Sequence, residues 1–136
     1  VASSRGYIKT LLGRKRRFDM WEPRDSWGER AYSLSEAHAQ YPKQELKRAY
    51  THTAMNALIQ GSSADITKSA MIKIYEAGLL DEIDLKLTVH DELDFSVNKD
   101  KQKCFEESLH IMKNCVDLKV PLKVDVEKGK NWGTIK

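Results

Sequence analysis

The sequence predicts an α+β fold, in which an antiparallel sheet packs against helices and a basic hairpin forms the amino-terminal part. Apolar and polar residues alternate on both sides of residues 90–92, and again over residues 122–126. This period of two is typical of half-buried strands. Helical periodicity over residues 44–77 supplies the second layer. With 136 residues and 40% hydrophobic content, the chain can form one core, and we expect a single domain over residues 1–136.

The amino-terminal residues 6–18 (GYIKTLLGRKRRF) predict a strand, a glycine turn at Gly13 and a second, basic strand. The cluster Arg14-Lys15-Arg16-Arg17 is explained most simply as a solvated basic edge. Its place after a glycine turn also allows Arg14 and the nearby backbone to lie close to a phosphate.

Residues 19–47 carry weaker signals. Trp21 and Trp27 are expected to anchor an irregular connection through apolar contacts, with base stacking as the alternative. Apolar residues recur in the polar segment 29–40, which predicts a short surface helix that ends before Pro42.

Residues 44–77 are predicted to be helical in two segments, with a break near Gly61-Ser62. Gly78 is expected to end this region. Apolar residues at helical spacing are expected to form its packing side: Met55, Leu58, Ile59, Ile66, Ala70, Met71 and Ile74.

A stripe of short polar side chains is expected on another side of this helix. His52, Asn56 and Gln60 recur every four residues and so stack along one face, with Ser63 and Thr67 continuing the line. Such a stripe most often marks the wet face of an amphipathic helix. Here, however, neutral amides and an imidazole replace the Lys and Glu that are usual on wet faces. Amide and imidazole donors match minor-groove acceptors that are nearly equivalent in every correct base pair, which suits them to testing pair geometry without reading sequence.

Residues 85–97 predict a hairpin whose connection carries His90, Asp91 and Glu92. An acidic, solvated turn is common, and these three residues alone favour that interpretation. Crowded carboxylates repel one another, however, so a bound hard cation would account for the pair. The apolar residues on either side of the connection are expected to share one buried face: Leu85, Leu87, Val89, Leu93, Phe95 and Val97.

Residues 99–117 predict a further helix, and Pro121 separates it from the expected strand at residues 122–126. Cys104 and Cys115 lie in this predicted helix without metal-ligand spacing, which favours a reduced, intracellular compartment over a disulfide framework. No apolar run approaches the roughly 20 residues of a membrane-spanning helix, so no membrane partner is expected. No signal-peptide pattern opens the chain either.

The positive charge is concentrated at one end of the chain. Residues 1–50 carry 11 Lys and Arg against 6 Asp and Glu, and all seven arginines lie within the first 48 residues. Guanidinium groups suit phosphates better than ammonium groups do. The amino-terminal third is therefore expected to face a polyanion.

Four blocks of the sequence resemble the carboxyl-terminal part of family A DNA polymerases, the DNA polymerase I family. In chain order they are GYIKTLLGRKRRF, THTAMNALIQGSSADITKSAMI, LTVHDELDFSV and VPLKVDVEKGKNWG. The combination of MNxxIQGSxAD with VHDEL is highly specific, and the sequence is most similar in form to phage or prophage members. The resemblance covers nearly the whole chain, weakest across residues 19–47. It implies a partial palm domain with the adjoining end of the fingers, in the cytoplasm of a bacterium or a phage-infected host cell.

The resemblance implies catalytic roles for the residues of the acidic connection. Asp91 matches the palm aspartate that binds the two catalytic Mg²⁺ ions, and Glu92 matches the adjacent acidic residue that supports the metal site. Because neighbouring residues on a strand point to opposite sides, Asp91 is expected to face the metals and Glu92 to lie more to the side. His90 matches the histidine beside the primer terminus and is expected to position it.

DNA-binding roles are implied for four further residues. Asn56 and Gln60 match residues that contact the template and the newly paired end through the minor groove. His52 stands where many members of the family carry Arg, and is expected to keep a donor role. Arg14 falls in the family's Gly-Arg block and is expected to contact a phosphate.

The implied activity is template-directed DNA synthesis, in which the primer 3′ hydroxyl attacks the α-phosphate of a deoxynucleoside triphosphate with the help of two Mg²⁺ ions. The motifs that supply the family's second metal-binding aspartate, and the Lys and Tyr that hold the triphosphate, are absent from this sequence, which starts with Val rather than Met. We therefore expect a fragment that works with the upstream remainder of the polymerase on primer–template DNA, and that alone binds DNA weakly and is inactive.

Two other functions are alternatives. A non-catalytic DNA-binding module needs only the basic amino-terminal part and the polar stripe. A small metal-dependent phosphohydrolase needs ligands beyond His90 and Asp91, and His38, His52 and His110 lack a spacing that would supply them.

Overall fold

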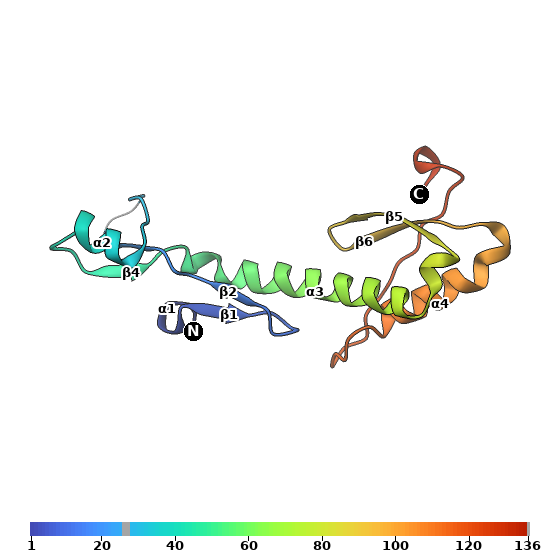
Figure 1. Cartoon of the computed structure of the whole chain (residues 1–136), viewed down its shortest axis with the longest axis horizontal. Helices are drawn as coiled ribbons and strands as arrows, with labels where there is room; N and C mark the ends of the chain where they lie inside the picture. The colour runs from blue at the N-terminus through green and yellow to red at the C-terminus, as the bar shows by residue number, and fades with distance from the viewer. Residues whose placement is uncertain (26–27, 136) are drawn as a thin grey trace. The chain divides into compact units, whose positions relative to one another are not determined.

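The computed structural model describes residues 1–25 and 28–135, so the role predicted for Trp27 lies outside the described residues. The chain divides into two compact units, Val1–Asp65 and Ile66–Lys136. Helices and small, two-stranded antiparallel sheets make up these units (Figure 1). The α+β class that the sequence predicts is therefore confirmed.

A basic hairpin lies near the start of the first unit. β1 (Tyr7–Lys9) pairs antiparallel with β2 (Lys15–Arg17), so that Ile8 lies opposite Arg16. All three residues of β2 are exposed. The hairpin therefore presents consecutive cationic side chains to solvent.

One apolar cluster forms the core of the first unit. It begins in α1 (Ala2–Arg5), which ends at Gly6 with a φ of 73°, a left-handed conformation that glycine adopts at little cost. The buried members of the cluster are Ala2, Ile8 and Phe18, and Ala54, Ala57 and Leu58 pack against them. The start of the long helix described below is thereby joined to the hairpin.

A second small sheet follows the hairpin in the first unit. β3 (Trp21–Pro23) pairs antiparallel with β4 (Leu46–Arg48), and α2 (Leu34–Gln40) lies between them in the sequence. Ser33 and Glu36 form a capping box at the start of α2. This cap explains why the helix is shorter than the predicted one.

Arg48 fixes Trp21 at the edge of this sheet. Its guanidinium carbon lies 4.5 Å from the centre of the half-buried Trp21 ring. The same guanidinium donates a hydrogen bond to the Phe18 carbonyl oxygen at 2.9 Å. Trp21 is thus held by a cation–π contact, an interaction that the expected apolar anchoring did not include.

The longest element is the continuous helix α3 (Ala54–Glu76), preceded by the 3₁₀ turn η1 (Thr51–Thr53). The predicted break near Gly61-Ser62 is wrong, because a glycine weakens a helix without preventing its hydrogen bonds. The predicted start at Gln44 is also wrong, because residues 46–48 pair with β3 instead.

Only part of the predicted packing side of α3 is buried. Met55 and Ile59 are exposed, because Ala57 and Leu58 face the core of the first unit. Ala70 and Ile74 are buried, as predicted. The helix thus presents its apolar residues on different sides along its length.

The second unit contains the predicted hairpin. Gly78, with a φ of 70°, follows the end of α3 as predicted and precedes the 3₁₀ turn η2 (Leu79–Asp81). β5 (Asp84–Val89) then pairs antiparallel with β6 (Glu92–Ser96). Ile83, immediately before β5, is almost fully buried and fixes the start of the hairpin in the unit's core.

A β-bulge at Lys86 interrupts the pairing of β5 with β6. Leu85 lies opposite Phe95 and Leu87 lies opposite Asp94, so Lys86 has no opposing residue in the ladder. The extra residue shifts the alternation of β5 by one position. Two residues that are two positions apart across the bulge, such as Leu85 and Leu87, therefore lie on opposite faces of the hairpin.

The bulge gives the hairpin two chemically different faces. Phe95 lies on the face that meets α4, where its ring contacts Phe105 with centroids 6.0 Å apart. Leu87 and Val89 lie on the other face, beside Glu92, and are 42% and 44% exposed. The prediction of one shared buried face is therefore wrong for Leu87 and Val89.

The helix α4 (Gln102–Lys113) follows the 3₁₀ turn η3 (Lys99–Lys101) and ends earlier than predicted. Cys115, just beyond it, is buried, and its carbonyl oxygen accepts a hydrogen bond from the Ser69 hydroxyl at 3.0 Å. Burial raises the pKa of the Cys115 thiol. Cys104 and Cys115 are both free thiols.

The predicted strand at residues 122–126 is not formed in the described part of the chain. Its alternation is present, because Leu122 and Val124 are half-buried whereas Lys123 and Asp125 are exposed. A strand also needs a partner, however, and none of the described segments pairs with this one. A last 3₁₀ turn, η4 (Trp132–Thr134), closes the described chain.

Among the described residues, no helix combines the length and the apolar character that crossing a membrane requires.

Candidate nucleic-acid interface and acidic turn

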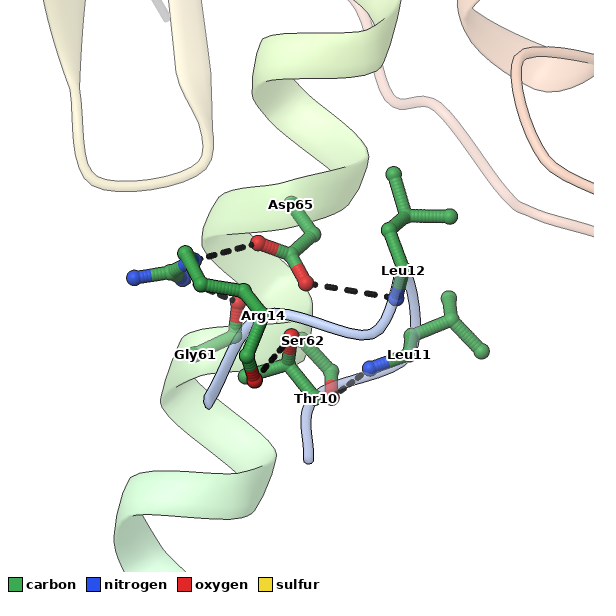
Figure 2. A network of polar contacts seen from close by, with 7 residues as sticks. All are labelled: Thr10, Leu11, Leu12, Arg14, Gly61, Ser62 and Asp65. Carbon is green, nitrogen blue, oxygen red and sulfur yellow. Dashed lines mark hydrogen bonds and ion pairs between the residues drawn. The ribbon is translucent and has the colours of Figure 1, made fainter. Parts of the chain in front are cut away.

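The turn between β1 and β2 is fixed to α3 by hydrogen bonds from its backbone (Figure 2). The Leu11 amide donates to the Ser62 hydroxyl oxygen at 3.0 Å. The Leu12 amide donates to Oδ2 of Asp65 at 3.3 Å. Two successive turn amides therefore find their acceptors on the helix.

Arg14 completes this network with its side chain. Its Nε donates to Oδ1 of Asp65 at 2.9 Å, and its Nη2 donates to the Gly61 carbonyl oxygen at 2.9 Å. The Thr10 hydroxyl donates to the Arg14 carbonyl oxygen at 3.2 Å, which tightens the turn. The guanidinium is thus held at two points, both on α3.

Close approach of the turn to α3 depends on Gly61. A Cβ atom at this position would lie 2.7 Å from Cγ2 of Thr10. Such a distance is well below van der Waals contact, so any side chain at position 61 would push the turn away. The glycine is therefore explained by packing rather than by a helix break.

Asp65 is an almost fully buried carboxylate, with a side chain only 6% exposed. Burial acts to raise its pKa, but hydrogen bonds from Thr10, Arg14 and Leu12 and the positive charge of Arg14 outweigh it and lower the pKa below its usual value. The single Thr10 hydroxyl hydrogen serves either this carboxylate or the Arg14 carbonyl oxygen at any moment. Asp65 is therefore charged at neutral pH and has donors for both oxygens.

The polar stripe lies on and just before α3. Asn56 and Gln60 are exposed and one helical turn apart, so they share a face of the helix. His52 is also exposed, but it belongs to η1 and not to α3. Thr67 is buried, so the exposed line does not continue that far, although Ser63 is exposed.

The acidic connection is a two-residue turn. Val89 pairs with Glu92, so His90 and Asp91 alone join the strands, and Glu92 is the first residue of β6. All three polar residues of the connection are exposed. His90 has a φ of 54°, a left-handed conformation that is uncommon for residues other than glycine, although asparagine, aspartate and histidine adopt it more often than most. The strand alternation used to orient Asp91 against Glu92 does not apply, because Asp91 lies in the turn.

The residues of this turn fit part of a magnesium site. Two adjacent, exposed carboxylates supply the hard oxygen ligands that Mg²⁺ prefers, and Mg²⁺ commonly binds one or two carboxylates together with substrate phosphates and waters. Within the described residues, no group of three or more His, Cys, Asp or Glu side chains is arranged to hold a metal ion. The turn therefore offers a partial ligand set.

The predicted site residues are divided between the two units. Arg14, His52, Asn56 and Gln60 belong to the first, and the three residues at positions 90–92 belong to the second. Asp65 was not among the predicted site residues. Its partners lie more than fifty positions away in sequence, so no local spacing could indicate its role.

Comparisons with known proteins support the resemblance that the four sequence blocks carry. The model of DNA polymerase family A matches residues 1–134. A DNA-directed DNA polymerase of Pseudomonas phage M6 is 42% identical over 97% of this chain and 16% of its own length. DNA polymerase I of Bacillus subtilis is 36% identical over 96% of this chain and 13% of its own length.

A eukaryotic relative shows how widely the similarity extends. DNA polymerase theta of Drosophila melanogaster is 33% identical over 99% of this chain and 6% of its own length. The chain thus spans less than a fifth of each of these relatives. Because the family model covers almost every residue, the chain belongs to DNA polymerase family A.

Proposed function

We propose that this chain forms part of the palm, with the adjoining end of the fingers, of a polymerase that extends a DNA primer along a template. The observation that carries the proposal is the family match over residues 1–134, which includes every predicted site residue. The exposure of both the acidic turn and the polar stripe supports it, since each must reach a substrate. The substrates are primer–template DNA and deoxynucleoside triphosphates.

Asp91 and Glu92 are the residues that would hold Mg²⁺ in the complete enzyme. When bound, two Mg²⁺ ions supply activation of the primer hydroxyl and charge stabilisation of the leaving pyrophosphate. His90 adjoins Asp91 in the two-residue turn, where its imidazole donates a hydrogen bond to the primer terminus and positions it. The φ of 54° at His90 is uncommon for a residue with a β-carbon, which supports a functional reason for a histidine at this position.

Asn56 and Gln60 test the newly formed base pair from the minor groove. Their amides share one exposed face of α3 and donate to the purine N3 and pyrimidine O2 acceptors. His52, in η1, extends this set of donors by one imidazole. Because these acceptors occupy equivalent places in all correct pairs, the contacts favour correct geometry and are blind to sequence.

Arg14 contacts a phosphate of the DNA backbone. Its side chain is 53% exposed, and it follows a turn that is packed against α3. The exposed cationic strand β2 adds sequence-independent attraction for the duplex.

The remaining parts of the site come from the upstream remainder of the polymerase. These are the second metal-binding aspartate and the Lys and Tyr that hold the triphosphate. The isolated chain therefore binds DNA weakly and does not extend a primer. The complete enzyme works in the cytoplasm of a bacterium or a phage-infected host cell.

The test is Asp91→Ala in the complete polymerase. Primer extension should fall by roughly a thousandfold or more, because metal binding contributes several kcal/mol to the transition state. DNA affinity should change little. Asp84→Ala, at the far end of the same hairpin, is the matched control and should keep near-normal extension.

Unchanged extension by the Asp91→Ala enzyme would overturn the proposed catalytic role and leave a non-catalytic DNA-binding module as the better description. Mixing the isolated chain with primer–template, Mg²⁺ and nucleotides tests the second part of the proposal. Clear extension there would show that no upstream segment is needed.

A further inference from the structure

The buried carboxylate of Asp65 is not needed to fold α3. It lies in the middle of the helix, where its own backbone groups are already hydrogen-bonded, yet its side chain accepts hydrogen bonds from the turn between β1 and β2. Burying a charged carboxylate without partners costs free energy. The groups that stabilise the charged form of this carboxylate all lie within the turn at residues 10–14. Its role is therefore to hold that turn, and Arg14 in particular.

The way in which Arg14 is held leaves it able to bind a ligand. A guanidinium has five N–H donors, and Asp65 and the Gly61 carbonyl take one each, from Nε and Nη2. These hydrogen bonds leave Nη1 unused, and the side chain is 53% exposed, so part of the guanidinium faces solvent. A planar donor fork that is fixed on one edge and open on the other suits a phosphate.

The network also sets where this fork lies relative to the polar stripe. Nη2 of Arg14 is 2.9 Å from the carbonyl oxygen of Gly61, the residue that follows Gln60 (Figure 2). A phosphate bound to Arg14 and a base edge bound to Gln60 are therefore presented from adjacent positions of one helix. Arg14 could not keep this place on its own long, flexible side chain.

We infer that Asp65 is a positioning residue, which fixes Arg14 against α3 so that its free donors bind a DNA phosphate next to the Gln60 contact. This inference rests on the proposed function and adds to it a residue that touches no substrate. Asp65 acts only through Arg14. Its negative charge by itself works against DNA binding.

The negative charge of Asp65 disfavours DNA binding, whereas its positioning of Arg14 favours it, so a substitution that removes the charge distinguishes the two effects. DNA binding by the isolated chain is measured by fluorescence anisotropy on a primer–template duplex, over a range of low salt concentrations. Asp65→Asn removes a negative charge but should weaken binding, by roughly tenfold, the loss expected for one charge-assisted contact. The slope of log affinity against log salt should become shallower by about 0.9, as for one lost phosphate contact.

Two further variants separate positioning from charge and from general damage. Asp19→Asn makes the same chemical change at an exposed site in the same unit, and its affinity should be unchanged or slightly higher. Arg14→Ala should lose as much affinity as Asp65→Asn, and combining the two changes should cost no more than Arg14→Ala alone.

Arg14→Lys keeps the inference testable even if Asp65→Asn does not fold. It leaves Asp65 in place and keeps the positive charge but removes the planar fork, so binding should still weaken while circular dichroism shows that the chain stays folded at the temperature of the assay. Tighter binding by Asp65→Asn with an unchanged salt slope, additive losses in the double variant, or normal binding by Arg14→Lys would each overturn the inference. No DNA binding by the unaltered chain would overturn the proposed function as well, so the two failures are distinguishable.

Discussion

At the scale of single residues, His90 shows how the proposed catalytic turn departs from the sequence rules for hairpins. Two-residue hairpin turns favour glycine or asparagine, because at least one of their residues needs a positive φ. His90 adopts a φ of 54° with a β-carbon that opposes it. A residue with a β-carbon in this conformation points to a role for its side chain.

His90→Gly should therefore leave the hairpin as stable as before, or more stable by up to about 1 kcal/mol. The complete polymerase carrying it should nevertheless lose activity, because the imidazole is gone. Urea unfolding of the isolated chain measures the first effect and primer extension the second. Thr88→Gly, an exposed position in β5 that pairs with Leu93, is the control and should destabilise by about 1 kcal/mol. Clear destabilisation by His90→Gly would show that the turn is not strained.

Asp65 makes stability depend on pH in a defined direction. Its pKa is lowered in the folded chain, so its contribution is fully present above the ordinary Asp pKa of about 4 and is lost as the pH falls through the lower, folded value. Unfolding free energies of the unaltered chain and of Asp65→Asn should therefore differ at neutral pH and converge in acid. Asp19→Asn serves as the control. A difference that grows as the pH falls would contradict this assignment.

At the scale of elements, the contact of the β1–β2 turn with α3 determines how a substitution of Gly61 affects stability. Alanine usually stabilises a helix relative to glycine, by about 0.5–1 kcal/mol. Here Gly61→Ala should destabilise the chain by roughly 1–3 kcal/mol, because the added Cβ would lie 2.7 Å from Cγ2 of Thr10.

Thr10→Ser provides the matched rescue for this prediction. It removes Cγ2 and keeps the hydroxyl that donates to the Arg14 carbonyl oxygen. The next atom that the new Cβ would meet is Nη2 of Arg14 at 3.6 Å, an ordinary contact. The double variant should therefore regain most of the stability lost by Gly61→Ala in chemical unfolding. An equally unstable double variant would mean that the clash is not with Thr10.

The elements also show which features a sequence pattern can predict. Alternation located β5 and β6 and the connection at residues 90–92, because both strands find their partners a few residues away. Alternation of the same quality at residues 122–126 gave no strand, because pairing depends on a partner that the local sequence does not specify. The bulge at Lys86 was also missed, since its residues keep a perfect period of two. Long-range contacts such as Arg14 with Asp65 have no local signal at all.

At the scale of the whole molecule, the hairpin of the second unit exposes strand edges and apolar side chains through which copies of the chain can associate. Among the described residues its sheet has two strands, each with one edge that no other described strand pairs with, and Leu87 and Val89 are exposed on one face. The isolated chain should therefore self-associate, which sedimentation velocity would detect as a concentration-dependent increase in mass.

Changing both Leu87 and Val89 to Thr should reduce this association while keeping strand-forming residues in place. Val120→Thr, at an exposed apolar position outside the hairpin, is the control and should have little effect. A monomeric chain with a sharp melt at high temperature would contradict the prediction.

The bulge at Lys86 also bears on transplanting the loop into another protein. A bulge adds right-handed twist and bends its strand, so it alters the heading of everything beyond it, including the tip at residues 90–91. A designer who grafted those residues onto a regular ribbon would copy their chemistry but aim it elsewhere. The graft would have to begin before position 86 to carry both the loop and its orientation.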